Sequence, residues 1–129
     1  MRNIRVFAVG HNFWLSETPD QMSIGWDAAY RRIATWVKLR ERDSGKEILY
    51  LNTHFDHVGK QARKESACMI VKWIRRHSDC GETILVGDFN VDQRSESYRE
   101  LVKTGFLTDS FEAAPIRMAA TGTVNGFDP

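Results

Sequence analysis

The segment Gly87–Asn90 carries a carboxylate and an amide at the point where a short apolar run ends. Asp88 and Asn90 are two residues apart, so in extended backbone their side chains point the same way. Strand ends are where open α/β sheets bind ligands. A carboxylate can hold Mg²⁺ or orient a water molecule, and an amide can hydrogen-bond a phosphate oxygen without adding charge. The alternative is an ordinary turn, since Asp and Asn are common there.

A second group of polar residues follows the apolar run 47–53 and consists of His54, Asp56 and His57. His54 could polarise a phosphoryl oxygen or protonate a leaving group, because imidazole titrates near neutral pH. Asn52 would share its face of the strand. The alternative is a surface histidine at the end of a strand.

The segment 53–57 also looks like a contracted metallo-β-lactamase signature, which makes a zinc hydrolase a distant alternative. That family needs further histidines at tight spacing, and only His11 and His77 remain in this sequence. His77 ends a predicted helix, where the helix dipole already favours it.

Arg63 lies near the start of the helix predicted after His57. Both its guanidinium and the helix N-terminus could meet an anion such as phosphate. The alternative is a solvated basic face, which we favour for the other cations of this helix.

The elements that must position these residues can be predicted from local patterns. Alternating apolar residues at 30–41, a turn signal at 43–46 and the run 47–53 indicate a β-hairpin. Apolar residues at helical spacing indicate a helix over 60–77, namely Ala67, Ile70, Val71 and Ile74. The continuous apolar run 83–86 predicts a short strand buried on both faces.

Shorter elements are expected on either side. Residues 4–9 and 12–15 are apolar enough for two short strands interrupted at Gly10, and 16–27 reads as a loop. Ser95 or Ser97 can cap a second helix that runs through Val102, and Gly105 suits its C-terminal end. Strand, helix, strand, helix after a hairpin predicts an α/β layered fold with a mixed sheet.

Composition supports an ordinary globular chain. The 129 residues are 42% hydrophobic and 27% charged, with a net charge of +1, so no global field attracts nucleic acid. No apolar run approaches the roughly 20 residues of a membrane span. Cys68 and Cys80 have no zinc-ribbon spacing, and we expect two free thiols in preference to a disulfide.

Taken in order, these motifs resemble the endonuclease/exonuclease/phosphatase family, whose members include relatives of pancreatic deoxyribonuclease I. The resemblance runs along nearly the whole chain and also suggests a bacterial branch. It is carried by Phe13–Pro19 (FWLSETP), Asn52–Asp56 (NTHFD), Arg63, Gly87–Asn90 (GDFN) and Thr121–Phe127 (TGTVNGF). Each motif is short, but five in the family's order are specific.

The resemblance implies part of a four-layer α/β/β/α sandwich, with a mixed, mostly antiparallel sheet and two main helices. It implies Mg²⁺ or Mn²⁺ and in-line attack of water on a phosphoester of a nucleic acid, lipid headgroup or sugar phosphate. Carried over by position, Asp88 would orient or deprotonate the water, Asn90 would bind phosphate and His54 would stabilise the transition state. Asn52 and Arg63 would bind substrate. Asp88 and Asn90 would be metal ligands, with the remaining ligands outside this chain.

The family's pattern also includes a Glu and an Asn near the N-terminus, and an Asp and a Ser-Asp-His near the C-terminus. The resemblance places all of these outside this chain, and Glu17 is not expected to be the missing Glu. We therefore expect residues 1–129 to be a single partial domain that lacks terminal strands and has little activity alone. Its uncovered sheet faces and edges could lead to self-association. The alternative function is a non-catalytic binding or assembly module that retains the fold.

Overall fold

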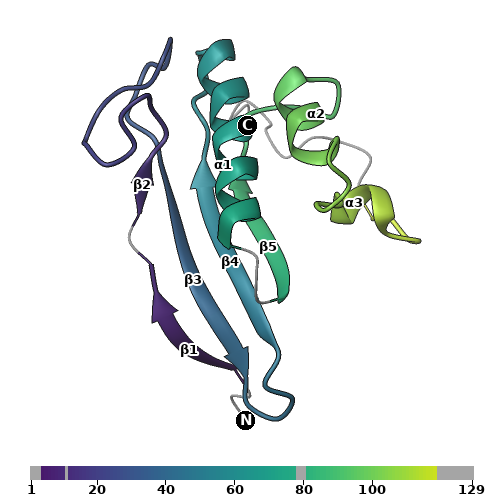
Figure 1. Ribbon diagram of the computed structural model, residues 1–129. Helices are drawn as coiled ribbons and strands as arrows, with labels where there is room; N and C mark the ends of the chain where they lie inside the picture. Colours follow the sequence, from purple (N-terminus) through teal and green to yellow (C-terminus); the bar gives the residue numbers. More distant parts are fainter. Residues whose placement is uncertain (1–3, 11, 78–80, 119–129) are drawn as a thin grey trace, which may run out of the picture.

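The computed structural model describes residues 4–10, 12–77 and 81–118. These residues form one sheet with helices packed against it (Figure 1). In chain order the elements are β1 (Ile4–Val9), β2 (Phe13–Trp14), β3 (Ile33–Glu41), β4 (Glu47–His54), α1 (Lys60–His77), β5 (Gly81–Asp88), α2 (Glu96–Val102) and α3 (Ser110–Ala113).

The sheet has the order β1-β3-β4-β5, and β2 pairs with β3 beyond the end of β1. All pairs are antiparallel except β4 and β5, which are parallel and joined by α1. The predicted fold class, a mixed and mostly antiparallel sheet with two main helices, is therefore confirmed. The two short N-terminal strands were also predicted, and they lie in line along one edge of β3.

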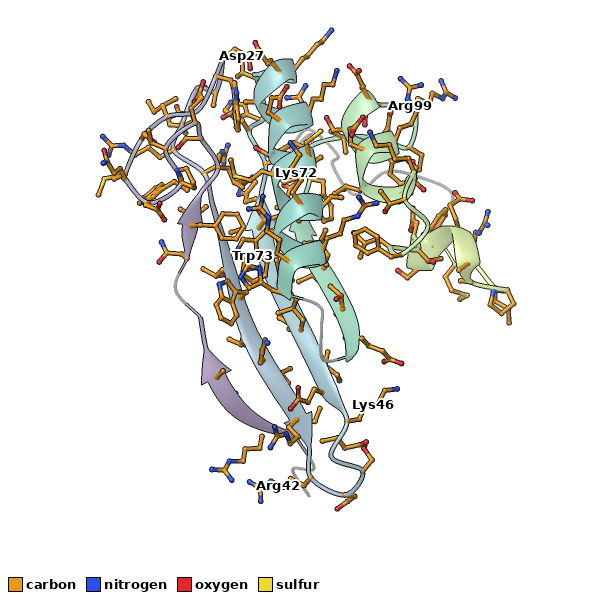
Figure 2. The ribbon with its side chains drawn as sticks, viewed as in Figure 1. Asp27, Arg42, Lys46, Lys72, Trp73 and Arg99 are labelled. Atoms are coloured by element: carbon orange, nitrogen blue, oxygen red, sulfur yellow. The ribbon has the colours of Figure 1, made fainter. Side chains whose placement is uncertain are left out.

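Gly10 lies between the two edge strands, and a side chain is excluded there for a steric reason. A Cβ built on Gly10 would lie 1.9 Å from the Trp36 ring, so only glycine fits between β1 and β2. Trp36 in turn packs on Trp73 of α1, and Trp73 stacks on Phe13 of β2. Figure 2 shows Trp73 on the side of α1 that faces β2 and β3.

The core lies between α1 and one face of the sheet. The predicted apolar stripe of α1 is confirmed, with its residues buried against alternate residues of β4. The buried cluster consists of Phe13, Leu15, Ala34, Leu49, Leu51, Phe55, Ala67, Ile70, Val71, Ile74 and Leu101. The predicted hairpin, the cap by Ser95 and the positive φ of Gly105 after α2 are also as expected.

The opposite face of the sheet is also apolar but only partly covered. Strand register places on it Val37, Leu39, Ile48, Tyr50, Ile84 and Val86. The prediction that 83–86 is buried on both faces is wrong, because Ile84 is 42% exposed. An apolar run of four residues does not reveal which of its two faces receives a covering layer.

The helix α2 packs on α1, and a thiol links the two helices. Cys68 is free, and its Sγ lies 3.1 Å from Oε2 of Glu100. Burial, together with this contact, raises the pKa of the Cys68 thiol to about 11. Cys80 lies outside the described residues. None of the helices among the described residues has both the length and the apolar character of a membrane span.

Candidate active site at the ends of β4 and β5

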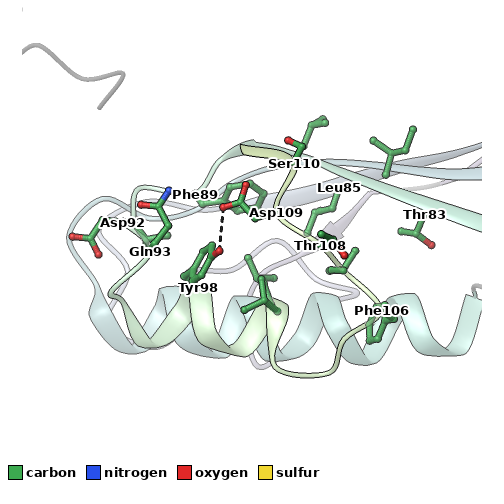
Figure 3. A pocket seen from close by; sticks show the side chains of 16 residues that line it. Thr83, Leu85, Phe89, Asp92, Gln93, Tyr98, Phe106, Thr108, Asp109 and Ser110 are labelled. Carbon is green, nitrogen blue, oxygen red and sulfur yellow. Dashed lines mark hydrogen bonds between the residues drawn. The ribbon is translucent and has the colours of Figure 1, made fainter. Parts of the chain in front are cut away.

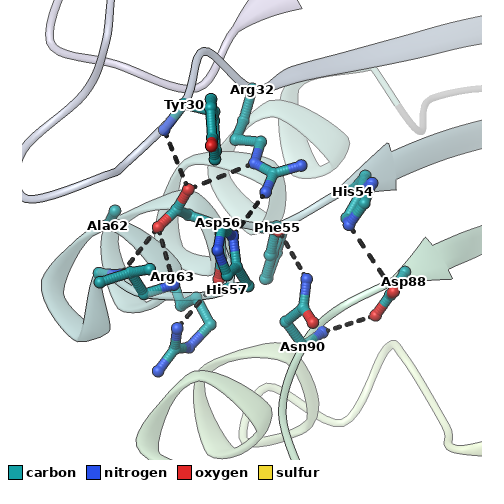
Figure 4. Close-up of polar contacts among 12 residues, drawn as sticks. Tyr30, Arg32, His54, Phe55, Asp56, His57, Ala62, Arg63, Asp88 and Asn90 are labelled. Atoms are coloured by element: carbon teal, nitrogen blue, oxygen red, sulfur yellow. Dashed lines mark hydrogen bonds and ion pairs between the residues drawn. The ribbon is translucent and has the colours of Figure 1, made fainter. Parts of the chain in front are cut away.

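The ends of β4 and β5 bring the two predicted groups of polar residues together. In the parallel register His54 lies beside Asp88, and Nε2 of His54 is 3.6 Å from Oδ2 of Asp88 (Figure 4). Both side chains are more than half exposed, on the partly covered face of the sheet. Asn52 is exposed two residues before His54 on that same face.

Gly87 allows the two strands to stay paired to their last residues. A Cβ on Gly87 would lie 1.9 Å from the carbonyl oxygen of Thr53, and its φ of +147° is one that other residues rarely adopt. The pairing continues one step further, since the N–H of Phe55 donates to the carbonyl of Asp88 at 2.8 Å. Gly87 therefore fixes the separation between the site's histidine and its carboxylate.

Asn90 is held by its backbone N–H group and by its side-chain amide. Its backbone N–H donates to Oδ1 of Asp88 at 2.9 Å, and its Nδ2 donates to the carbonyl of Phe55 at 2.9 Å. Its φ of +49° is unusual for a residue with a side chain, although Asn tolerates it better than most. The turn alternative and the site prediction are thus compatible: Asp88 makes a turn at the strand end, and that turn points the Asn90 amide at β4.

Asp56 has a structural role that the sequence did not reveal. It is 1% exposed, and its Oδ2 accepts the N–H groups of Val58 and Gly59. Its Oδ1 accepts the N–H of Tyr30 at 3.3 Å and pairs with Nε of Arg32 at 3.4 Å. Burial by itself raises the pKa of Asp56, but the backbone N–H donors outweigh it and hold that pKa well below the usual range.

Two backbone N–H groups at the N-terminus of α1, where an anion could have bound, are already occupied by a carboxylate of this chain. Asp27, at the end of the loop 16–27, accepts the N–H groups of Ala62 at 2.7 Å and Gln61 at 3.3 Å. The hydrogen bond from Ala62 is the largest of the interactions that lower the pKa of Asp27, so the cap stays ionised. A residue that lies 34 or 35 positions away in sequence occupies these donors, which no local pattern could indicate.

Arg63 lies beside the site, and one of its donors is used for structure. Its Nη1 donates to the carbonyl of Asp56 at 2.9 Å, so the guanidinium holds the loop after β4. The neighbouring loop is also ordered: Ser16 is fully buried, and the carboxylate of Glu17 accepts the N–H of Trp26. Glu17 is therefore engaged within its own loop, the loop predicted over 16–27.

Asp88 and Asn90 are the residues of the predicted set that suit a divalent cation. They present carboxylate and amide oxygens, and Mg²⁺ binds through one or two carboxylates together with water and substrate phosphate. Within the ranges that the structure describes, no group of three or more His, Cys, Asp or Glu is arranged to hold a metal. The zinc alternative lacks support from the geometry, because Asp56 is committed to Arg32 and to backbone donors.

A separate hollow of about 620 Å³ lies between β5 and the helices α2 and α3 (Figure 3). Its lining is largely apolar, with Leu85, Phe89 and Phe106 among the residues, and Tyr98 donates to Asp109 within it at 3.1 Å. Its lining includes neither His54 nor Asp88 nor Asn90, so the hollow and the candidate site are different places.

Comparison with known proteins gives the family. No protein-family model matches the chain. A solved endonuclease/exonuclease/phosphatase family protein from Bacteroides thetaiotaomicron shares 44% identity over 98% of this chain, with a TM-score of 0.89. A solved mannosyl-6-phosphatase of the same organism also shares 44% identity over 98% of the chain, with a TM-score of 0.90. An uncharacterised protein of Acanthamoeba polyphaga mimivirus is 35% identical over 86 residues, 63% of this chain and 31% of its own length.

The chain belongs to the endonuclease/exonuclease/phosphatase family, as its motifs predicted. It spans a little under half of the two solved relatives, 46% and 48% of their lengths. The fifth motif, Thr121–Phe127, and His11 fall outside the described residues.

Proposed function

We propose that the ends of β4 and β5 form part of the active site of a metal-dependent phosphoester hydrolase. The observation that carries the proposal is the pairing of His54 with Asp88, both exposed, at the ends of adjacent parallel strands. The family of the solved relatives supports a phosphoester as the substrate, and one of them is a mannosyl-6-phosphatase.

In this proposal Asp88 positions the attacking water and accepts its proton through Oδ2, the oxygen that faces His54. His54 donates a hydrogen bond to a phosphoryl oxygen, where negative charge develops. Asn90 uses one amide hydrogen to hold Phe55, which leaves its second amide hydrogen and its Oδ1 for phosphate or metal. Asn52 and Arg63 contact the substrate from β4 and α1.

Mg²⁺ or Mn²⁺ would be held by the oxygens of Asp88 and Asn90 together with further ligands. When bound, such an ion neutralises charge on the phosphate oxygens. The residues described here fix the geometry around it: Gly87 sets the distance between β4 and β5, and Phe55 holds the Asn90 amide.

The test uses the intact natural protein that carries this sequence, assayed with Mg²⁺ and bis(p-nitrophenyl) phosphate or p-nitrophenyl phosphate. Asp88→Asn is expected to lower kcat by about 100- to 10,000-fold, the range for loss of a general base. Asp92→Asn is the matched control: Asp92 is an exposed carboxylate in the next turn, bonded to the N–H of Arg94. Equal kcat values for the two variants would refute the role of Asp88.

The same assay separates the alternatives. A wild-type protein that turns over neither substrate favours the non-catalytic module. The isolated chain of 129 residues is expected to show little or no turnover; robust turnover that Asp88→Ala abolishes would contradict that expectation. Self-association through the partly covered face stays a prediction, which light scattering of the isolated chain can test.

A further inference from the structure

Tyr30 and His57 form an exposed pair of rings beside the candidate site, and neither has a role in the chemistry proposed above. Their ring centroids are 5.7 Å apart with planes 19° from parallel. Tyr30 is 63% exposed, which is unusual for a large aromatic side chain without a partner molecule. The guanidinium carbon of Arg32 lies 6.0 Å from the centre of the Tyr30 ring.

This ring pair is held in place by buried groups. Asp56 accepts the backbone N–H of Tyr30 and pairs with Nε of Arg32, and Asp56 itself is almost fully buried. Nη2 of Arg32 then lies 3.3 Å from Nδ1 of His57. The position of both rings therefore derives from one inaccessible carboxylate, which limits their freedom before any ligand arrives.

The contact with Arg32 also decides which nitrogen of His57 carries a proton. A guanidinium only donates hydrogen bonds, so Nδ1 of His57 must be the acceptor. The neutral imidazole then carries its hydrogen on Nε2. His57 is exposed, so it presents this N–H as a donor of defined direction at the surface.

The ring pair lies close along the chain to His54, the residue proposed to contact the phosphate. His57 follows His54 by three residues, a span of at most about 11 Å between their α-carbons. The backbone between them is fixed, since Asn90 Nδ2 binds the carbonyl of Phe55 and Arg63 Nη1 binds that of Asp56. Figure 4 shows His57 between Arg32 and Arg63, with Asn90 lying between His57 and Asp88.

We propose that Tyr30 and His57 are the subsite for the leaving group of the substrate, and that this group is a monosaccharide. The C–H face of the sugar lies on the exposed Tyr30 ring, and a sugar hydroxyl oxygen accepts the hydrogen bond from Nε2 of His57. Such an edge donor matches a hydroxyl, whereas stacking of a nucleobase needs no donor beside the ring. The inference rests on the proposed function, because it names the substrate class of that same site.

The test measures binding as well as turnover in the intact natural protein. Calorimetry compares glucose 6-phosphate, mannose 6-phosphate, methyl phosphate and adenosine 5′-monophosphate. The wild type is expected to bind a hexose 6-phosphate about tenfold more tightly than methyl phosphate, the scale of one aromatic contact and one hydrogen bond. Tyr30→Ala and His57→Ala are each expected to remove most of that preference and to leave methyl phosphate affinity unchanged. Tyr30→Phe keeps the ring, and His57→Gln keeps an N–H near the Nε2 position, so both should retain the preference.

Phe111→Ala is the matched control, because Phe111 is an exposed aromatic residue on α3, outside the site. The proposal is overturned if Tyr30→Ala behaves like Phe111→Ala, if the wild type shows no preference for hexose phosphates, or if it prefers the nucleotide. A protein that hydrolyses p-nitrophenyl phosphate without any hexose preference refutes the subsite but supports the proposed function. A hexose preference that depends on Tyr30, in a protein without hydrolase activity, supports the subsite and refutes the proposed function.

Discussion

Asp56 lies two residues after the end of β4, and Asp88 is the last residue of the neighbouring parallel strand β5. The two carboxylates nevertheless differ in almost every physical respect. Asp56 is 1% exposed, and its two oxygens accept from three backbone N–H groups and pair with Arg32. Asp88 is 58% exposed; its Oδ1 accepts one N–H, and its Oδ2 faces His54 across 3.6 Å. A position at a strand end therefore does not define a role. The two residues differ in how many of their carboxylate oxygens remain free to accept a hydrogen bond from a ligand.

The two carboxylates are nevertheless coupled through the backbone. Asp56 fixes the loop whose carbonyl groups, at Phe55 and Asp56, receive Asn90 and Arg63. The candidate active site thus depends on a residue that contacts no substrate in the proposed mechanism. Breaking the Asp56 network should lower stability first and activity as a consequence, whereas changes at Asp88 should lower activity and leave stability almost unchanged.

The largest expected effect comes from the matched substitutions Asp56→Asn and Asp88→Asn. Asp56→Asn leaves Arg32 without its charge partner and turns an N–H₂ group toward backbone donors, so it should cost about 3–5 kcal/mol of unfolding free energy. Asp88→Asn keeps an acceptor for the N–H of Asn90 and is exposed, so it should change stability by less than about 0.5 kcal/mol. Urea denaturation of the intact protein measures both. Equal losses of stability in the two variants would contradict the distinction drawn here.

The meeting of two motifs at the candidate site could be predicted from the order of the strands and the helix along the chain. Parallel strands joined by a helix bring their carboxyl ends to one edge, so the motifs at 52–54 and 87–90 had to meet if both strands existed. The role of Asp56 could not be predicted in this way. Its partners Tyr30 and Arg32 lie 26 and 24 residues earlier, at the start of the segment 30–41, whose alternation predicts a strand but no partner for Asp56. Asp56 and His57 therefore looked alike in sequence as candidates for chemistry.

The features of the fold also differ in whether nearby residues or distant contacts determine them. The hairpin of β3 and β4 and the helix α1 follow from turn residues and periodicity, which act over a few positions. The capping of α1 by Asp27 and the exposure of Ile84 depend on what lies across space from them. The sequence therefore did not indicate the cap, and the prediction that 83–86 is buried on both faces was wrong. Glycine positions are intermediate: a glycine within a strand often marks a close approach of another group, but only the structure shows that at Gly87 this group is the Thr53 carbonyl.

A smaller effect is expected from Gly87→Ala, which displaces Asp88 and leaves Asp56 untouched. The new methyl group would collide with the Thr53 carbonyl, so β4 and β5 must separate, at a cost of about 1–3 kcal/mol. The turnover of the intact protein should fall as well, because the distance between His54 and Asp88 changes. Gly45→Ala is the control: its φ is also positive, at +72°, but no atom lies within 4 Å of the added Cβ. If Gly45→Ala lowers activity as much as Gly87→Ala does, the separation of the strands is not the cause.

The smallest expected effect is the pH dependence that Asp56 gives to the stability of the protein. The pKa of Asp56 is lower in the folded protein than in the unfolded chain, because backbone N–H groups bind its ionised form. Its contribution to stability is therefore complete above the ordinary carboxyl pKa of about 4 and is lost as the pH falls below it. Below that pH, the unfolding free energy of the wild type should fall more steeply than that of Asp56→Asn, by at most about 1.4 kcal/mol per pH unit for one proton. Parallel curves for the wild type and Asp56→Asn between pH 2 and pH 5 would mean that Asp56 titrates alike in both states, and that its hydrogen bonds do not favour the charged form.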